Sequence, residues 1–155
     1  MKALFIGRFQ PFHLGHLSVL ADIDKTPEIA KILIGIGSSQ YHGTEDNPLT
    51  FEKRKEMIEI AIKNEIKKPC QIYAVPDIHD DQFWVSHVKE IVGDFDLVYS
   101  GNSRVTKLFK QAECEVKPVE FKYDISGTKL RKMIKENHPE WKKFIPKSIT
   151  NTIAQ

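Results

Sequence analysis

Short apolar runs alternate with longer amphipathic segments along this chain, and this alternation is the feature that most constrains its fold. The apolar runs have the length of β-strands and lie at 2–6, 30–36, 71–75, 96–100 and 114–118. The segments between them predict helices at 14–24, 50–66, 82–92 and 103–111, then one from about Gly127 and a short one near the C-terminus. Alternation of this kind predicts an α/β protein with a mostly parallel sheet and helices on both faces.

The length and composition fit one globular domain of this Rossmann-like, doubly wound type. The chain has 155 residues, 41% hydrophobic and 28% charged, without repeats or a linker, so we expect a single domain over 1–155. Its net charge of +2 is small for a nucleic-acid-binding protein. No apolar run approaches the roughly 20 residues of a membrane span. We therefore expect neither nucleic acid nor membrane as a partner.

Two further features of composition bear on location and ligands. Cys70 and Cys114 lie far apart without metal-ligand spacing and no secretory signal precedes them, which predicts reduced thiols in a cytoplasmic protein. The segment from 129 to 147 contains seven Lys and Arg residues and only two acidic residues, Glu136 and Glu140. This segment is either a solvated helix face or a rim that attracts an anionic substrate.

The polar loops of the chain are expected to meet at one place. In a doubly wound sheet, ligands bind in the crevice beyond the carboxyl ends of the strands. The segments expected there are rich in Gly, His, Asp, Asn, Ser and Arg, and they are 7–16, 37–47, 76–84, 100–104 and 119–131. The sequence therefore predicts one ligand site formed by these five loops.

The first of these loops, GRFQPFHLGH (7–16), has the layout of a phosphate site, with a strand, a glycine, a polar loop and a helix start. His13 and His16 are three residues apart in the first helical turn, where Gly15 allows close approach of the backbone. Two imidazoles beside Arg8 suit a triphosphate. The alternatives are a structural histidine pair, half of a zinc site and a surface arginine. No cysteine or carboxylate completes a zinc set, so we predict no metal ligand.

The same stretch resembles the signature of the HxGH nucleotidylyltransferase superfamily, and its longer form is similar to that of the archaeal-type nicotinamide mononucleotide (NMN) adenylyltransferases. The resemblance continues through IGIGSSQ (34–40), NPLTFEKR (47–54), VPDIHDDQFWVSHV (75–88), VYSGNSRV (98–105) and YDISGTKLR (123–131). It implies a nucleotidyltransferase of NAD biosynthesis that converts ATP and NMN to NAD and pyrophosphate. It also implies Mg²⁺ or another divalent cation with ATP, and a homo-oligomer.

The resemblance assigns roles to individual residues. The catalytic set would be His13, His16, Arg8 and Arg131, with Arg131 and Thr128 on the outer phosphates of ATP. The other ATP-binding residues would be Gly7, Phe9, Gly101, Asn102 and Ser126. Taken alone, Ser126 and Thr128 could be helix caps and Arg131 a surface arginine.

The NMN-binding residues would be Gly37, Ser38, Asp77, Ile78 and Trp84. Gly37 and Ser38 would bind the mononucleotide phosphate or form a simple turn. The backbone of Asp77 and Ile78 would read the carboxamide. Trp84 would stack on the nicotinamide ring or be a core residue.

The chain departs from the family pattern at two positions. Asp81 stands where relatives often have Asn, and Asp46 where some have an arginine. Arg104 could face phosphate or solvent.

We expect direct in-line attack of the NMN phosphate on the α-phosphorus of ATP, without a protein nucleophile. Two rival functions remain at this point. One is a sister enzyme acting on phosphopantetheine, flavin mononucleotide or, with CTP, an alcohol phosphate. The other is a non-catalytic nucleotide sensor.

Overall fold

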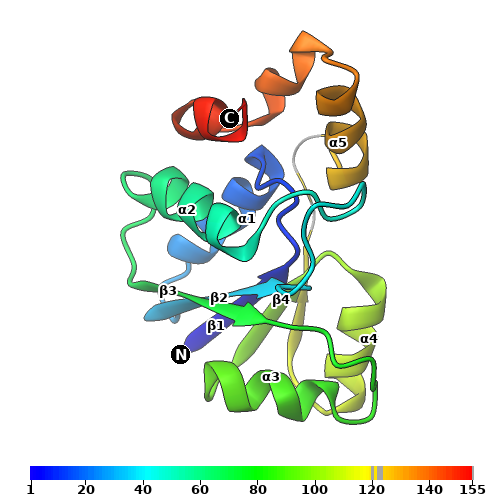
Figure 1. The fold of residues 1–155 in the computed structure, drawn as a ribbon. Coiled ribbons are helices and arrows are strands. Elements are labelled where there is room, and N and C mark those ends of the chain that lie inside the picture. The colour runs from blue at the N-terminus through cyan, green and yellow to red at the C-terminus, as the bar shows by residue number, and fades with distance from the viewer. Residues whose placement is uncertain (120, 122–123, 155) are drawn as a thin grey trace.

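The sheet is built from five parallel strands in the order β3-β2-β1-β4-β5 (Figure 1). The computed structural model describes residues 1–154 except 120, 122 and 123. The elements are β1 (Lys2–Gly7), α1 (Leu14–Asp24), β2 (Lys31–Gly37), α2 (Phe51–Ile62), β3 (Cys70–Val75), α3 (Trp84–Val92), β4 (Leu97–Ser100), α4 (Ser103–Gln111), β5 (Val116–Pro118), α5 (Gly127–Lys135), the short 3₁₀ helices η1 (Pro139–Phe144) and η2 (Lys147–Ile149), and α6 (Thr150–Ala154).

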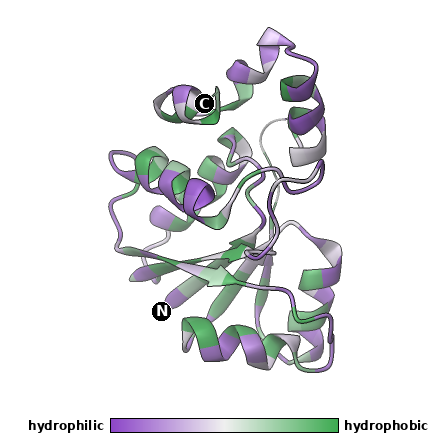
Figure 2. Ribbon diagram, viewed as in Figure 1, coloured by the Kyte–Doolittle hydropathy of each residue, from purple (hydrophilic) through white to green (hydrophobic). Residues whose placement is uncertain are grey.

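Alternate residues of the strands face two separate cores, as the pleat of a strand requires. From β1, Ala3 and Phe5 enter the core formed with α1, α2, α5 and the C-terminal helical segment. Leu4 and Ile6 enter the second core, formed with α3 and α4. Figure 1 shows these two helical layers above and below the sheet, and Figure 2 shows the hydrophobic strands between them. The predicted Rossmann-like architecture is therefore confirmed.

The observed boundaries agree with the sequence to within a few residues. Helices α1 and α4 have the predicted limits. Helix α2 ends at Ile62 rather than at 66, because the N–H groups of Glu65 and Ile66 both turn back to the Ile62 carbonyl. This turn carries the side chain of Ile66 into the first core. Both cysteines are free, and burial raises the pKa of Cys70 to about 11. Among the described residues, no helix has the length and apolarity needed to cross a membrane.

The order of the strands fixes the position of the crevice. The chain runs from β1 outward to β2 and β3, and then returns to β4 on the other side of β1. Loops leaving the carboxyl ends of β1 and β4 therefore diverge toward opposite faces and open a crevice between them. This is the edge at which the five polar loops of the sequence were expected to meet.

Candidate active site

His13 and His16 cap the same helix end through each other. His13 is the N-cap of α1, and its Nδ1 accepts from the backbone N–H of His16 at 3.3 Å. The Nδ1 of His16 accepts in turn from the backbone N–H of His13 at 3.1 Å. The two rings are stacked with their centroids 3.6 Å apart. The arrangement is a capping box in which imidazoles replace the usual hydroxyl and carboxylate groups.

The reciprocal cap determines the protonation of both imidazoles. Because each Nδ1 accepts a hydrogen bond, a neutral ring must carry its proton on Nε2. Burial lowers the pKa of His13 to about 4. Burial, and then the neighbouring charge of His13, lower the pKa of His16 well below 6.5. At neutral pH the pair therefore offers two uncharged Nε2–H donors from fixed rings.

Aromatic rings hold this pair in place. Phe9 and Phe12 pack against the ring of His16, with centroids 4.8 and 5.5 Å away. Phe121, which follows β5, contacts both imidazoles edge-on at 5.3 and 5.6 Å. Gly15 is required by close approach, since a Cβ there would lie 2.8 Å from Cε1 of His13. The glycine thus makes room for the His13 ring to fold over the first turn.

Arg131 reaches the first loop from α5. Its Nη1 donates to the carbonyl of Gln10 at 2.9 Å, although the two residues are 121 positions apart. Its Nη2 donates to the hydroxyl of Thr128 at 3.2 Å, which orients the guanidinium. Ser126 caps α5 by accepting from the N–H of Lys129. The structure therefore brings Arg131 to the same loop as the two histidines.

The rim of the first loop carries a concentration of positive charge. Arg8 is exposed. Burial, and then the charge of Arg8, lower the pKa of both Arg131 and the buried Arg54. Asp46 opposes this shift at Arg131. The ion pairs found among the described residues include none of these three arginines. Such a rim favours a ligand with several negative charges.

Glutamine side chains tie the loops of the site together. The amide of Gln10 donates to the carbonyl of Leu49 and accepts from its N–H, both at 2.9 Å. The amide of Gln40 pairs in the same way with the backbone of Asp77, at 2.9 and 3.0 Å. Each side chain thus replaces a missing backbone partner, and each joins two loops that come from different strands.

On the side of the site predicted to bind NMN, several residues already have hydrogen-bond partners within the protein. The hydroxyl of Ser38 already donates to the carboxylate of Asp77 at 2.7 Å. The N–H and carbonyl of Asp77 are engaged by Gln40, which leaves the neighbouring Ile78 for reading a carboxamide. Tyr41 and His79 are joined at 2.6 Å and extend the contact between these loops. The loops 37–41 and 76–79 therefore form one connected wall.

Two aromatic residues of the predicted site lie in the core. Trp84 is only 6% exposed and packs edge-on against Phe109, with centroids 5.4 Å apart. Its stacking on nicotinamide remains a prediction that depends on the small exposed part of the ring. Phe9 is 1% exposed as a whole residue, so its predicted contact with ATP requires the site to open. Both rings are buried by their packing. Phe9 packs against the imidazole of His16, and Trp84 packs against Phe109 of α4.

Asp81 and Arg104, whose roles the sequence leaves open, form an ion pair with each other. Asp81 belongs to the loop after β3, and Arg104 lies in the first turn of α4. Both side chains are exposed, so the pair contributes little stability. It joins the loop before α3 to the first turn of α4, which Asn102 caps by accepting from the N–H of Val105.

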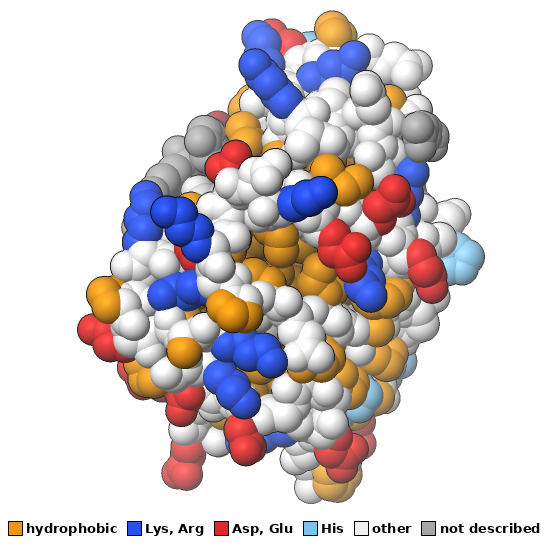
Figure 3. Space-filling model, turned by 90° about the vertical axis from the view of Figure 1, so that its left-hand side faces the viewer, with side chains coloured by type: hydrophobic (Ala, Val, Ile, Leu, Met, Phe, Trp, Pro, Cys, Tyr) orange, Lys and Arg blue, Asp and Glu red, His pale blue; other side chains and the backbone are white. Residues whose placement is uncertain are grey.

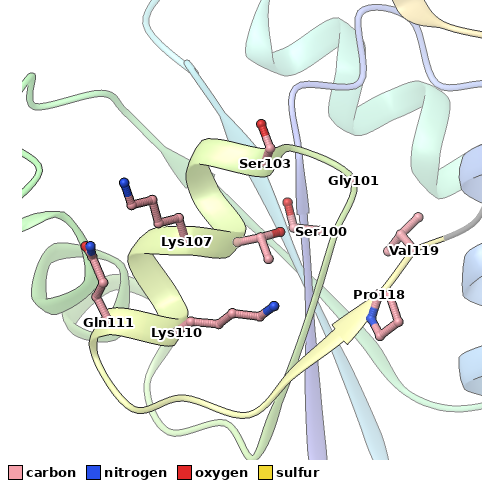
Figure 4. A pocket seen from close by; sticks show the side chains of 9 residues that line it. Ser100, Gly101, Ser103, Lys107, Lys110, Gln111, Pro118 and Val119 are labelled. Atoms are coloured by element: carbon pink, nitrogen blue, oxygen red, sulfur yellow. The ribbon is translucent and has the colours of Figure 1, made fainter.

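Two hollows adjoin this edge of the sheet. One, of about 790 Å³, lies beside Arg131 and is lined also by Asp46, Thr128 and Lys132. The other, of about 690 Å³, begins at Gly101 and runs between α4 and the end of β5. In Figure 4, Lys110 points across this second hollow toward Pro118, whereas Lys107 points away.

In the basic segment from 129 to 147, both Lys132 and Lys135 line the first hollow. Lys135 pairs there with Glu45 at 3.1 Å, and Lys143 pairs with Glu140 at 3.3 Å. Attraction of an anionic substrate by this segment stays a prediction. On the face drawn in Figure 3, acidic and basic side chains are interspersed around a hollow with hydrophobic walls.

Gln10, Gln40 and Arg54 were not among the predicted site residues. Arg54 is fully buried on α2, at the position one turn before Met57 and Ile58 on the buried face. That periodicity was visible in the sequence and could have identified it. The two glutamines gave no such signal, because their partners are backbone groups of distant loops.

Replacement of Gly15 by Ala tests the packing of the imidazole pair. The added Cβ would lie 2.8 Å from His13 and 3.0 Å from Phe121, so the ring of His13 must leave its cap position. Alanine is favoured over glycine in helices by about 1 kcal/mol. We expect Gly15→Ala to unfold at nearly the wild-type denaturant concentration. Nucleotide binding and turnover should fall at least about tenfold, because the imidazole of His13 is displaced.

Gly93→Ala is the matched control, because Gly93 has φ +79° and no atom within 4 Å of its missing Cβ. It should lower stability through backbone strain and leave turnover unchanged. Unaltered turnover in Gly15→Ala would show that the His13 ring does not need this space.

The titration of the imidazoles tests their neutral state. The pKa of His13 is about 4 in the fold and about 6.5 in an unfolded chain. Between these values the unfolded chain binds more protons, so stability is complete above pH 6.5 and is lost as the pH falls toward 4. Nuclear magnetic resonance of the imidazoles should show His13 titrating near 4 with the proton on Nε2.

Urea unfolding at pH 7 and pH 4.5 provides the second readout. His13→Asn keeps an N-cap acceptor but removes the titrating ring, so its stability should fall less over this range. Titration of His13 near 6.5 in the folded protein would contradict the neutral pair.

The chain matches the family model described as Cytidylyltransferase-like over residues 4–133. It is 41% identical to the nicotinamide-nucleotide adenylyltransferase of Methanococcus aeolicus, over all of this chain and 89% of that protein. It is 36% identical to the enzyme of the same name from Archaeoglobus fulgidus, over all of this chain and 91% of the relative.

Among solved structures, a bifunctional NMN adenylyltransferase/ADP ribose pyrophosphatase from Francisella tularensis, complexed with AMP and a manganese ion, has a TM-score of 0.72 and 26% identity. The match covers 93% of this chain and 44% of that one, so this chain spans less than half of the two-activity protein. The family model matches residues 4–133, from β1 to α5, and this range includes the imidazole pair, Arg8 and Arg131. The chain belongs to the cytidylyltransferase-like family, and its relatives there are nicotinamide-nucleotide adenylyltransferases.

Proposed function

We propose that this protein transfers the adenylyl group of ATP to NMN, giving NAD and pyrophosphate, as its relatives' names describe. The observation that carries the proposal is the meeting of His13, His16 and Arg131 at one loop. Neutral donors and a guanidinium held against the same backbone suit a polyphosphate that is being cleaved. A protein that only senses nucleotides does not need hydrogen-bond donors fixed beside a leaving pyrophosphate.

The proposed reaction needs no covalent intermediate with the protein. An oxygen of the NMN phosphate attacks the α-phosphorus of ATP, and the bond from that phosphorus to the bridging oxygen of the β-phosphate breaks. The electron pair leaves with pyrophosphate. The protein contributes positions and hydrogen-bond donors for the oxygens on which negative charge develops.

The proposed placement of the substrates follows the loops. The triphosphate lies against His13, His16 and Arg8, and its outer phosphates reach Arg131 and Thr128. The adenosine lies beside Gly101, at the open end of the hollow along α4. NMN occupies the wall formed by the loops 37–41 and 76–79. A phosphate that reaches the imidazoles displaces the ring of Phe121 that now covers them.

We propose that Mg²⁺ or another divalent cation enters bound to the phosphates of ATP. Among the described residues, no group of three or more His, Cys, Asp or Glu side chains is arranged as a metal site. Phosphate oxygens and water can supply the ligands that a hard cation requires. The cation would neutralise part of the charge of the leaving pyrophosphate. We further propose a cytoplasmic enzyme that acts as a homo-oligomer.

The activity is tested by mixing the protein with ATP, NMN and Mg²⁺ and measuring NAD and pyrophosphate. Removal of His16 in His16→Ala should lower kcat by about 10²–10³, the usual cost of one donor to a developing negative charge. With ¹⁸O in the NMN phosphate, the label should appear only in NAD.

His138→Ala is the matched control, because His138 also caps a helical turn, with Nδ1 accepting from Glu140, yet lies outside the five loops. It should keep wild-type turnover. No NAD from the wild-type protein, with product from another phosphorylated acceptor, would assign the apparatus to a sister enzyme. Product from nicotinic acid mononucleotide as well would extend the range of acceptors.

A further inference from the structure

Arg54 is a fully buried cation whose hydrogen bonds all go to backbone carbonyls. It lies in the second turn of α2, and its side chain has no exposed surface. Its three nitrogens donate at 2.9–3.5 Å to the carbonyls of Arg8, Gly37, Ser38, Ser39, Tyr41 and Thr50. In the part of the chain that the structure describes, no ion pair includes it.

This set of acceptors explains how a charge can be buried there. An unpaired cation inside a protein is costly unless its hydrogen-bonding groups are satisfied. A guanidinium presents its N–H groups as a planar fork, and here carbonyl dipoles surround that fork. Burial, followed by the charge of Arg8, lowers the pKa of Arg54 to about 10, so it remains protonated at neutral pH.

Apart from that of Thr50, which caps α2, the carbonyls belong to two loops, and these are proposed to bind different substrates. Arg8 lies in the first loop, which carries the imidazole pair. Gly37 ends β2 and begins the wall that is continued by Ser38 and Asp77. Nη1 of Arg54 bonds to Arg8 at 3.0 Å and to Gly37 at 2.9 Å. One nitrogen atom therefore spans the ends of two neighbouring strands, β1 and β2.

We propose that Arg54 is a positioning residue that sets the separation between the loop binding the ATP phosphates and the loop binding the acceptor phosphate. This proposal rests on the proposed function, because it concerns the distance between two phosphates that must react. An error of about 1 Å in such a distance can cost 10²-fold in rate even when each substrate still binds.

Two substitutions separate positioning from simple stabilisation. Arg54→Lys keeps the charge, but one ammonium group with three N–H donors cannot bond to all the carbonyls that the guanidinium now holds. Arg54→Met removes both the charge and the N–H donors. Assayed well below the unfolding temperature of each variant, both should show kcat lowered by about 10–100-fold. ATP and NMN, titrated separately by calorimetry, should bind to Arg54→Lys within a few-fold of wild type.

Lys55→Met is the matched control, because Lys55 is the next residue of α2, is exposed and pairs with Glu59 at 3.7 Å. It removes one positive charge from the same turn and should leave kcat unchanged. If folded Arg54→Lys and Arg54→Met keep wild-type kcat and only unfold more easily, Arg54 is a structural residue and the proposal is overturned. A wild-type protein that makes no NAD would instead overturn the proposed function.

A measurement on the wild-type protein does not require a folded variant. In nitrogen-15 spectra of the arginine side chains, Arg54 Nε–H should be protected from exchange, since it is buried and bonded to Thr50. Its resonance should shift when NMN and a non-hydrolysable ATP analogue bind together. A resonance that responds to neither nucleotide would show that Arg54 is not coupled to the two loops.

Discussion

The reciprocal hydrogen bonds between His13 and His16 are the interaction on which the site depends. Each imidazole satisfies a backbone N–H that the start of α1 would otherwise leave without a partner. The same two bonds fix the rings, direct both protons to Nε2 and force the rings to stack. Helix formation and preparation of the donors are therefore one event, and Gly15 is the residue that makes the stacking sterically possible.

Much of the remaining loop structure is held by side chains that bond to backbone atoms. Gln10 and Gln40 each act as a surrogate backbone amide, and Arg54 draws together carbonyls from two strand ends. Side chains that bond to main chain fix the path of a loop and leave its other side chains free for a ligand. These bonds help to hold the crevice between the diverging loops at a defined width.

The fold and the position of the site were predictable because both follow from local patterns. The alternation of apolar runs and amphipathic segments is a short-range signal, and the carboxyl edge of a parallel sheet gathers the loops wherever they occur. The positions of Trp84 and Arg54 depended instead on which face of a helix each residue occupies. Trp84 shares its face with Val85, Val88 and Val92, so its burial was readable from spacing, although its polar loop suggested exposure. The glutamine bridges depended on distances between loops, which sequence patterns do not encode.

In the proposed reaction, different groups hold the polyphosphate and assist its cleavage. Arg8 and Arg131 carry permanent charge, which would attract ATP but would also retain pyrophosphate. The imidazoles are neutral, so they add hydrogen bonds without adding a further full charge that would hold the product. Donors of this kind contribute most when charge grows on the oxygens that they contact, and that occurs in the transition state rather than in the bound substrate. Burial of the histidine pair, which lowers both pKa values, is thus the physical means by which the fold keeps these donors neutral.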